Sequence, residues 1–370
     1  MIAIPDAFAG RYALARARFI AGVATAGISL QQYRHPLKGL EGEELAVDAA
    51  LDGPIDAEHL LIVSSGCHGV EGLCGSGVQV FALHDDEWRE KARQQGVAVL
   101  YVHALNPHGF SFLRRVTEEN VDLNRNFIDF GKPLPVNAGY DELHPILLPE
   151  QWPPTLQNEM ALGKLVSERG EAALQAIISR GQYQRPDGLF YGGHAPTWSH
   201  QTLRTILQSY GRKASRIAWL DLHTGLGPFG FCERIYSGRN EAASMQRAVD
   251  WWSGNGATPV TVAGDGDSAS AELTGQMHSA IYEECPHAQF TGLTLEFGTI
   301  PAVQVLQALR GDQWLQLHGD AADDTLAQQI QSQMRAAFYD ESDGWKGQVI
   351  SQARQAMFQA VDGLTGRSAK

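Results

Sequence analysis

Cysteine and long apolar runs are scarce in this chain. Its 370 residues include four cysteines, and no two of them form a Cys-x-x-Cys pair. We therefore expect neither a disulfide framework nor a thiolate zinc knuckle, and such low cysteine usage fits a reducing cytoplasm. No uninterrupted apolar run approaches the roughly 18 residues that a transmembrane helix needs. The N-terminus has no basic stretch leading into a long apolar run, so no secretory signal is expected.

Positive charge is also scarce. The chain has 29 Lys and Arg against 42 Asp and Glu, which gives a formal net charge of −13. This balance excludes a generally basic surface of the kind that binds nucleic acid. The net negative charge would also be repelled by an anionic membrane surface. With 44% hydrophobic and 19% charged residues, the composition is that of a globular protein with ample material for a core. The sequence gives no indication of an oligomeric state.

Short apolar runs rich in β-branched residues alternate with helix-like stretches. The predicted strands are residues 60–63, 97–102, 217–220, 259–262 and 293–297. The predicted helices are residues 75–93, 158–178, 241–252, 313–338 and 349–361, with a long loop at 132–154 and a flexible loop at 264–270. Near-continuous apolar strands are typical of an α/β sheet buried on both faces. We predict one layered α/β catalytic domain over 1–370, with a soft N-terminal boundary near residue 55, a motif core at about 55–300 and a helical segment at 301–370.

The run Gly66-Cys67-His68-Gly69-Val70-Glu71-Gly72 follows the first predicted strand. On a tight turn leaving a strand, His68 and Glu71 would both face one metal ion. His223, near the end of a later strand, would be the third ligand. Two imidazoles and a carboxylate form a zinc set that leaves a fourth position for water, so we predict one Zn²⁺ per chain. The alternative is a glycine-rich turn holding a polar pair, with His223 a strand-end histidine.

Glu296 lies within the strongly apolar run Thr294-Leu295-Glu296-Phe297. A carboxylate there is costly to bury unless it is paired or used. Hydrolysis assisted by a metal needs a general base to move protons, and Glu296 is our candidate. The alternative is a structural salt bridge to an arginine.

A local arginine cluster stands out in this acidic chain. Arg114 and Arg115 precede Asn120-Val121-Asp122-Leu123-Asn124-Arg125-Asn126-Phe127. Arginines near a zinc site stabilise an oxyanion or hold a substrate carboxylate through two parallel hydrogen bonds. The alternative is charge pairing with nearby acidic residues, which applies better to Arg114 than to Arg125.

These elements in this order resemble the zinc carboxypeptidase superfamily, which includes the succinylglutamate desuccinylase and aspartoacylase group. The resemblance is closest to the bacterial DUF2817 branch, and Gly181-Gln182-Tyr183 and Gly188-Leu189-Phe190-Tyr191-Gly192-Gly193 also look typical of it. The motifs run from about residue 60 to about 300. The resemblance implies a mixed, mostly parallel central sheet flanked by helices.

The resemblance also implies a role for each matching residue. His68, Glu71 and His223 match the zinc ligands, and Glu296 matches the general acid/base. Asn124 and Arg125 match the pair that binds a substrate carboxylate. Arg115 is our choice for the arginine that polarises the scissile carbonyl, with Arg114 as its competitor. The family's mobile tyrosine has no counterpart in residues 264–274, which puts a classical carboxypeptidase specificity in doubt and leaves room for small N-acyl amino acids.

The sequence therefore predicts a cytoplasmic zinc hydrolase that cleaves an amide bond in a peptide or N-acyl amino acid bearing a free carboxylate. One rival interpretation is a cysteine hydrolase that uses Cys67 as the nucleophile; as sequence neighbours, Cys67 and His68 would point apart, which disfavours this. The other rival is a zinc-binding scaffold without catalytic activity. A pure scaffold has no need of Glu296 as a base.

Overall fold

The computed structural model describes residues 2–254, 257–319 and 323–366 and is organised around a sheet of eight strands. The strands lie in the order β1-β2-β4-β3-β5-β8-β6-β7. Their bounds are β1 Ser29–Lys38, β2 Glu44–Asp52, β3 His59–Ser65, β4 Val97–His103, β5 Arg216–Thr224, β6 Cys232–Tyr236, β7 Val260–Val262 and β8 Gln289–Phe297. The central strands β4, β3, β5 and β8 run parallel, whereas β1, β2 and β6 join through antiparallel pairs. The predicted mixed, mostly parallel sheet is confirmed.

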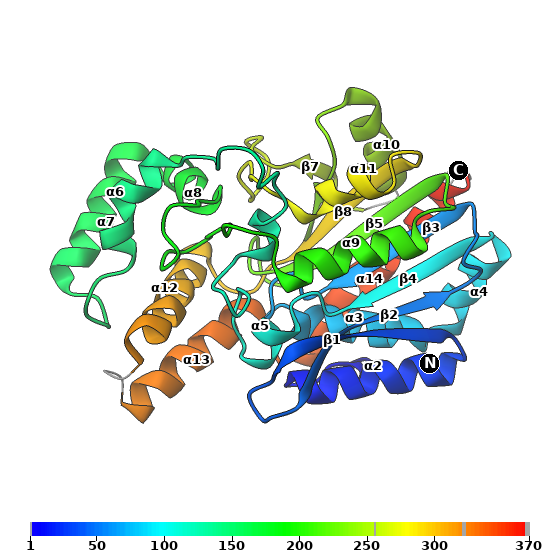
Figure 1. Ribbon diagram of the computed structural model, residues 1–370, viewed down its shortest axis with the longest axis horizontal. Helices are drawn as coiled ribbons and strands as arrows, with labels where there is room; N and C mark the ends of the chain where they lie inside the picture. Colours follow the sequence, from blue (N-terminus) through cyan, green and yellow to red (C-terminus); the bar gives the residue numbers. More distant parts are fainter. Residues whose placement is uncertain (1, 255–256, 320–322, 367–370) are drawn as a thin grey trace.

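Helices flank both faces of this sheet (Figure 1). In chain order they are α1 Ile4–Ala7, α2 Tyr12–Ala26, α3 Gly72–Leu83, α4 Asp86–Gln94, α5 Pro107–Ser111, η1 Leu123–Arg125, α6 Ala138–Leu147, α7 Leu156–Arg169, α8 Glu171–Ser179, α9 Trp198–Tyr210, α10 Ala242–Trp252, η2 Met277–Ser279, α11 Ala280–Glu284, α12 Ala302–His318, α13 Asp324–Phe338 and α14 Asp343–Leu364. Helices α3, α4 and α14 pack on one face, and α9 lies against the other. Helices α6, α7 and α8 form a group to one side of the sheet, on the left of Figure 1. No helix among the described residues is long and apolar enough to cross a membrane.

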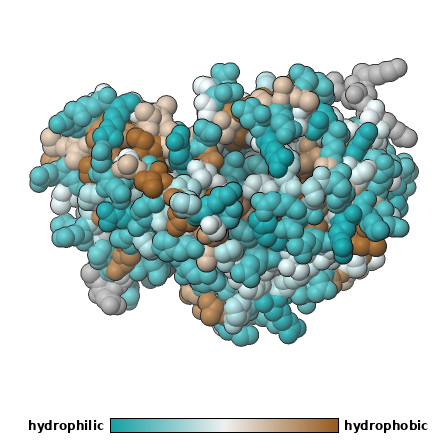
Figure 2. Space-filling model, turned by 45° about the horizontal axis from the view of Figure 1, so that its top comes forward, coloured by the Kyte–Doolittle hydropathy of each residue, from teal (hydrophilic) through white to brown (hydrophobic). Residues whose placement is uncertain are grey.

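Strand β3 shows why the central strands are apolar throughout. Leu61 and Val63 belong to the hydrophobic core on one side of the sheet, and Leu60 and Ile62 to the core on the other. Successive side chains of a strand point to opposite faces, so a strand covered on both faces must be apolar at every position. The face of the molecule in Figure 2 is largely hydrophilic, with hydrophobic side chains in small scattered groups.

All five predicted strand runs coincide with strands, but β1, β2 and β6 were not predicted. β1 is mostly exposed or half-buried, and β6 is short and carries Glu233 and Arg234, so neither shows a continuous apolar run. The N-terminal segment before residue 55 is not separate from the sheet, because β2 pairs with β4.

Several predicted helix and loop boundaries were wrong. The predicted helix 75–93 is divided into α3 and α4 at Asp85, whose side chain caps α4 by accepting from the Trp88 amide. The predicted helix 158–178 breaks at Gly170, which has a φ of 82°. Residues 313–338 belong to α12 and α13, and residues 320–322 of that prediction, like residues 367–370 of the predicted C-terminal segment, lie outside the described residues. The predicted loop 132–154 contains α6.

Candidate metal centre

The candidate ligands lie where two parallel strands end. β3 ends at Ser65, and the chain turns at Gly66, with a φ of 64°, before His68, Glu71 and the start of α3. A Cβ on Gly69 would lie 2.0 Å from the carbonyl carbon of Gly109, so this turn requires glycine. His223 is the second-last residue of β5, the parallel neighbour of β3. The carboxyl ends of adjacent parallel strands meet at one edge of a sheet, where α/β folds usually place their sites.

His68, Glu71 and His223 come together there. They are buried, and each offers a ligand atom within 4.8 Å of the others. Nδ1 of His68 lies 2.8 Å from Oε1 of Glu71, and Nδ1 of His223 lies 3.0 Å from Oε2 of the same carboxylate. The two imidazoles thus direct the same kind of nitrogen toward one carboxylate, an arrangement suited to a shared cation.

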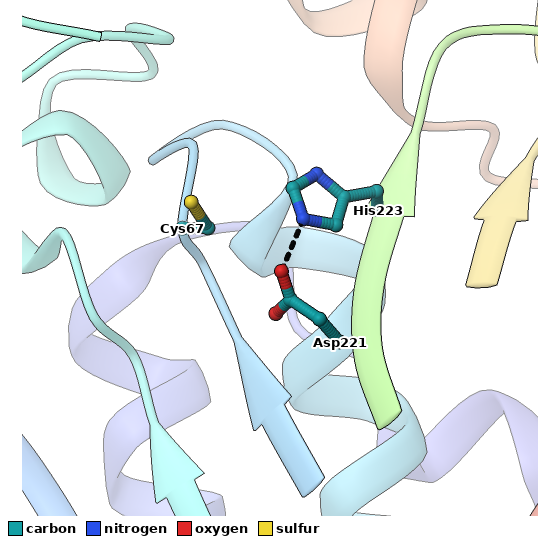
Figure 3. Close-up of side chains that lie close together, drawn as sticks. All are labelled: Cys67, Asp221 and His223. Atoms are coloured by element: carbon teal, nitrogen blue, oxygen red, sulfur yellow. Dashed lines mark hydrogen bonds and ion pairs between the residues drawn. The ribbon is translucent and has the colours of Figure 1, made fainter. Parts of the chain in front are cut away.

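The outer nitrogen of each imidazole meets an aspartate. Nε2 of His68 lies 3.2 Å from Oδ1 of Asp122. Nε2 of His223 contacts Asp221 (Figure 3), which also accepts a 2.6 Å hydrogen bond from the Ser64 hydroxyl. Metal-binding histidines usually present their second nitrogen to a carboxylate, which fixes the ring and the proton on it. The donor set and its surroundings therefore fit a divalent metal such as zinc.

A second group of potential ligands, Cys67, Asp221 and His223, overlaps the first because it shares His223 (Figure 3). Cys67 is fully buried, and burial, followed by the negative charge of Asp221, raises the pKa of its thiol well above the ordinary value. A protonated thiol is a poor nucleophile and a poor metal ligand. The environment of Cys67 argues against the cysteine hydrolase and favours the group built on His68 and Glu71.

The ionisation of the cluster follows from its mutual contacts. Burial alone would raise the pKa of Glu71, but the charges of His68 and His223 outweigh it and hold this pKa far below its ordinary value. Burial would likewise raise the pKa of Asp122, and Arg115 leads the groups that lower it well below the usual range. Both carboxylates therefore stay ionised at neutral pH, as binding a cation requires.

Glu296 lies beside the cluster. It is the register partner of His223 across β5 and β8, and the Leu226 amide donates a 3.1 Å hydrogen bond to its Oε1. Among the described residues no basic side chain lies within ion-pair distance of Glu296, so the predicted alternative of a salt bridge is not seen. Burial, followed by the charge of Glu71, raises the pKa of Glu296 to about 8. A carboxyl group with such a pKa both takes and returns protons near neutral pH.

Arg114 and Arg115 are neighbours in sequence, but their side chains make contacts in different parts of the structure. Arg115 lies in the cluster: Nη2 is 2.7 Å from Nε2 of His68, and Nη1 is 3.3 Å from Oε1 of Glu71. Its Nε donates a 3.0 Å hydrogen bond to Asp122. Arg114 instead donates to Asp312 at 3.0 Å and does not contact the cluster. Only Arg115 of the two is placed to reach a group bound there.

Asn124 and Arg125 lie in η1, close to the cluster. Asn124 Oδ1 accepts a 2.9 Å hydrogen bond from the Met277 amide, which leaves its side-chain NH₂ group to donate elsewhere. Arg125 is 2% exposed, and its Nε and Nη2 both donate to the Ser179 carbonyl, at 2.8 and 2.6 Å. Its Nη1 donates to the Asn124 carbonyl at 2.9 Å and lies 3.7 Å from Oδ1 of Asp122, so only one further N–H on each terminal nitrogen remains.

Sequence reasoning assigned no role to two residues that shape the site. Asp122 joins its two halves, since Oδ1 meets His68 and Oδ2 meets Arg115. A metal-bound histidine usually needs a carboxylate partner for its second nitrogen, and a search for such a partner would have indicated Asp122. Phe190 lies with its ring 5.2 Å from the guanidinium carbon of Arg115 and 5.6 Å from that of Arg125. Nothing local in the sequence indicates this packing.

Comparison with known families and structures identifies the family and the fold of the chain. The model of a family described as a protein of unknown function, DUF2817, matches residues 8–352. The chain belongs to the DUF2817 family. No curated protein sequence matches it.

Solved structures give the fold relationship of this DUF2817 protein. Bovine thrombin-activatable fibrinolysis inhibitor, in complex with tick carboxypeptidase inhibitor, matches with a TM-score of 0.51 at 10% identity, over 97% of this chain and 98% of that one. Another structure of thrombin-activatable fibrinolysis inhibitor matches with a TM-score of 0.52 at 9% identity, over 97% of this chain and 77% of that one. At these identities the likeness describes the fold.

Proposed function

We propose that this protein is a zinc-dependent hydrolase that cleaves an amide bond in a peptide or N-acyl amino acid bearing a free carboxylate. The observation that carries the proposal is the convergence of His68, Glu71 and His223 beside Glu296, a buried carboxyl with no basic partner among the described side chains. The similar bovine structure was solved with a carboxypeptidase inhibitor, which adds support from the fold.

His68, Glu71 and His223 would hold the zinc ion. When bound, zinc acts as a Lewis acid that polarises a carbonyl group and lowers the pKa of water. Asp122 and Asp221 keep Nδ1 of each imidazole directed inward through their contacts with Nε2. These contacts fix the ligands before substrate arrives.

The chain's own side chains supply proton transfer and charge stabilisation. Glu296 would accept a proton from the attacking water and return it to the departing nitrogen, a sequence that its raised pKa favours. Arg115 would donate to the oxygen of the scissile carbonyl as negative charge develops there. Its contacts with Asp122 and Glu71 hold its guanidinium at the cluster.

Asn124 and Arg125 would position the substrate through its carboxylate. The side-chain NH₂ group of Asn124 and the remaining N–H of each terminal nitrogen of Arg125 would be the donors, beside the bonds that Arg125 makes to Ser179 and Asn124. A charge-assisted hydrogen bond to a carboxylate is about twice as strong as a neutral one. Such an anchor confines the enzyme to substrates with a free carboxylate close to the scissile bond.

The proposal is tested by hydrolysis of a substrate panel by zinc-loaded protein. The panel contains dipeptides, tripeptides, N-acetyl and N-succinyl amino acids, each with a C-terminally amidated control and each with and without chelator. Chelator-sensitive cleavage confined to free-carboxylate members is the expected result, and the best substrate decides between peptidase and acylase. Failure to cleave any member, by protein shown to contain zinc, would favour the catalytically inactive scaffold.

A further inference from the structure

Backbone strain gathers around the two arginines of the candidate site. Among the described residues, positive φ outside glycine occurs at Leu113 (52°), Asn120 (62°) and Phe190 (54°). Leu113 and Asn120 lie on either side of Arg115 in the chain, and the ring of Phe190 packs against both Arg115 and Arg125. The left-handed region is unfavourable for a residue as bulky as phenylalanine, and strain of this kind persists mainly at binding and catalytic sites. The conformation of Phe190 therefore points to a role for its side chain in the site.

Hydrogen bonds of the neighbouring backbone hold Phe190 in this conformation. The Phe190 carbonyl accepts from the Gln182 amide at 3.1 Å. The next carbonyl along the chain, that of Tyr191, accepts from the Asp122 amide at 2.8 Å. The segment that carries the ring is thus joined directly to the residue whose carboxylate contacts both site arginines.

The guanidinium groups of Arg115 and Arg125 lie close enough to repel each other. Burial lowers the pKa of Arg125, the charge of Asp122 opposes this, and the positive charge of Arg115 lowers the pKa of Arg125 further. Asp122 is shared between them, at 3.0 Å from Arg115 and 3.7 Å from Arg125. The other carboxylate near Arg115 belongs to Glu71, which is assigned to the metal. Two buried cations therefore face one shared carboxylate, and a further attractive contact has a large effect on where they lie.

The ring of Phe190 provides such a contact. Its centroid lies 5.2 Å from the guanidinium carbon of Arg115 and 5.6 Å from that of Arg125, both within the roughly 6 Å of a cation–π interaction. An aromatic ring attracts the face of a guanidinium group, whereas a carboxylate takes up its N–H groups. Phe190 therefore stabilises both cations without occupying the N–H donors that a substrate would use. A second carboxylate at this position would occupy those donors and cancel the positive charge.

We infer that Phe190 is a positioning residue whose ring face holds Arg115 in place for the scissile carbonyl and Arg125 in place for the substrate carboxylate. The inference rests on the proposed function, because that function assigns the two arginines their roles. Phe190 acts through the guanidinium groups and not on the reacting atoms. A weaker attraction by the ring would let both groups turn away from these positions, so substrate binding and turnover would decline together.

The test changes the charge distribution of the ring and leaves its shape nearly unchanged. Phe190 is replaced in the full chain by 4-fluoro-, 3,5-difluoro- and 3,4,5-trifluorophenylalanine, because each fluorine weakens the negative potential of the ring face. Phe190→Leu keeps an apolar side chain without that face. The matched control is the same fluorinated series at Phe81, which is buried in α3 and makes no cation–π contact among the described residues.

Two readouts are measured for each protein. The first is kcat and KM on the panel of amide substrates, with the zinc content of the same sample. The second is the binding of N-acetylalanine, measured by calorimetry in zinc-loaded Glu296→Gln protein that carries the same replacements. The binding readout does not depend on turnover.

With each added fluorine at Phe190, kcat/KM should fall, by about three- to thirtyfold over the series, the range expected for the loss of a cation–π contact. This loss should combine a lower kcat with a higher KM, and the affinity for N-acetylalanine should fall in the same order. The Phe81 series should retain the wild-type values, and zinc content should not change in either series. If Phe190→Leu is impaired but the fluorinated Phe190 series is not, the ring only fills space and the inference is overturned.

The two readouts separate Phe190 from the proposed hydrolase. Affinity for N-acetylalanine that falls along the Phe190 series, without hydrolysis of any substrate, would support Phe190 and refute the hydrolase. Hydrolysis that every Phe190 replacement leaves unchanged would refute the role of Phe190 alone. Absence of both hydrolysis and N-acetylalanine binding in protein with an unmodified Phe190 would refute both.

Discussion

The two halves of the candidate site are built in different ways. His68, His223 and Glu296 lie at or just beyond the ends of hydrogen-bonded parallel strands, so the backbone ladder fixes their spacing. Arg115 and Arg125 lie on irregular chain between α5 and α6, where buried ion pairs with Asp122 hold them. The sheet-borne half (His68, His223 and Glu296) thus depends on strand pairing. The loop-borne half (Arg115 and Arg125) depends on individual side-chain contacts, of which the ion pairs with Asp122 are shared by both arginines. The predictions below separate the two.

The largest expected effect is a loss of turnover when Glu296, in the sheet-borne half of the site, is replaced. Glu296→Gln keeps the size of the side chain and the acceptor for the Leu226 amide but removes the proton carrier. Turnover should fall by about three or more decades, as when a catalytic group is removed, while zinc content stays at that of wild type. Steady-state kinetics on the best panel substrate, with metal analysis of the same sample, measures both. Near-normal turnover would refute the proposed mechanism.

The next effect separates neighbouring arginines in the loop-borne half. Arg115→Met should lower kcat/KM by about a hundredfold or more, since removing one donor to a developing oxyanion costs that much. Arg114→Met removes the ion pair with Asp312 and should lower stability with little effect on kcat/KM. Kinetics and denaturant unfolding of both variants test the assignment. The opposite order of kinetic effects would transfer the role to Arg114.

A smaller effect is expected where the halves meet. Asp122→Asn keeps the shape of the side chain but removes the charge that His68 and Arg115 share. Zinc affinity should drop about ten- to a hundredfold, as for the loss of other carboxylate partners of metal-bound histidines. Chelator competition measures the zinc dissociation constant, and Asp312→Asn, which alters the pair with Arg114, is the control. Equal affinities in wild type and Asp122→Asn would show that the two halves are independent.

The smallest effect concerns the stability of the metal-free protein. Folding raises the pKa of Glu296 from 4.5 to about 8, so the folded state binds this proton more tightly than the unfolded chain. That stabilisation is present below about pH 4.5 and is lost as the pH rises to 8. Glu296→Gln cannot titrate, so from pH 5 to pH 8 it should gain roughly 2–5 kcal/mol in unfolding free energy relative to wild type. Urea unfolding in the presence of chelator measures the difference in unfolding free energy between Glu296→Gln and wild type at each pH. A difference that stays constant from pH 5 to pH 8 would contradict the raised pKa of Glu296.

The sequence predicted the sheet-borne half better than the loop-borne half for a physical reason. The apolar runs of β3, β5 and β8 are local signals, and knowing that they are parallel is enough to bring His68, His223 and Glu296 to one edge. Assigning roles to these residues still relied on family resemblance. Their roles stay predictions.

The features that escaped prediction depend on contacts distant in sequence or, for β6, on a strand without an apolar pattern. The pairing of Arg114 with Asp312 and the contact of Arg125 with the Ser179 carbonyl join chain segments far apart. β6 was missed because Glu233 and Arg234 interrupt its apolar pattern. Glu233 could not be placed beside Glu296 without the antiparallel register of β6 and β8.

The central claim is that His68 and Glu71, together with His223, hold the metal, and the overlapping group containing Cys67 offers a direct contrast. The deciding measurement is the zinc content per chain of wild type, His68→Ala, His223→Ala and Cys67→Ala after dialysis against limiting zinc. We predict one zinc ion in wild type and in Cys67→Ala, and loss of zinc in both histidine variants. Zinc retained by His68→Ala and lost by Cys67→Ala would contradict the account, because the metal would then belong to Cys67, Asp221 and His223.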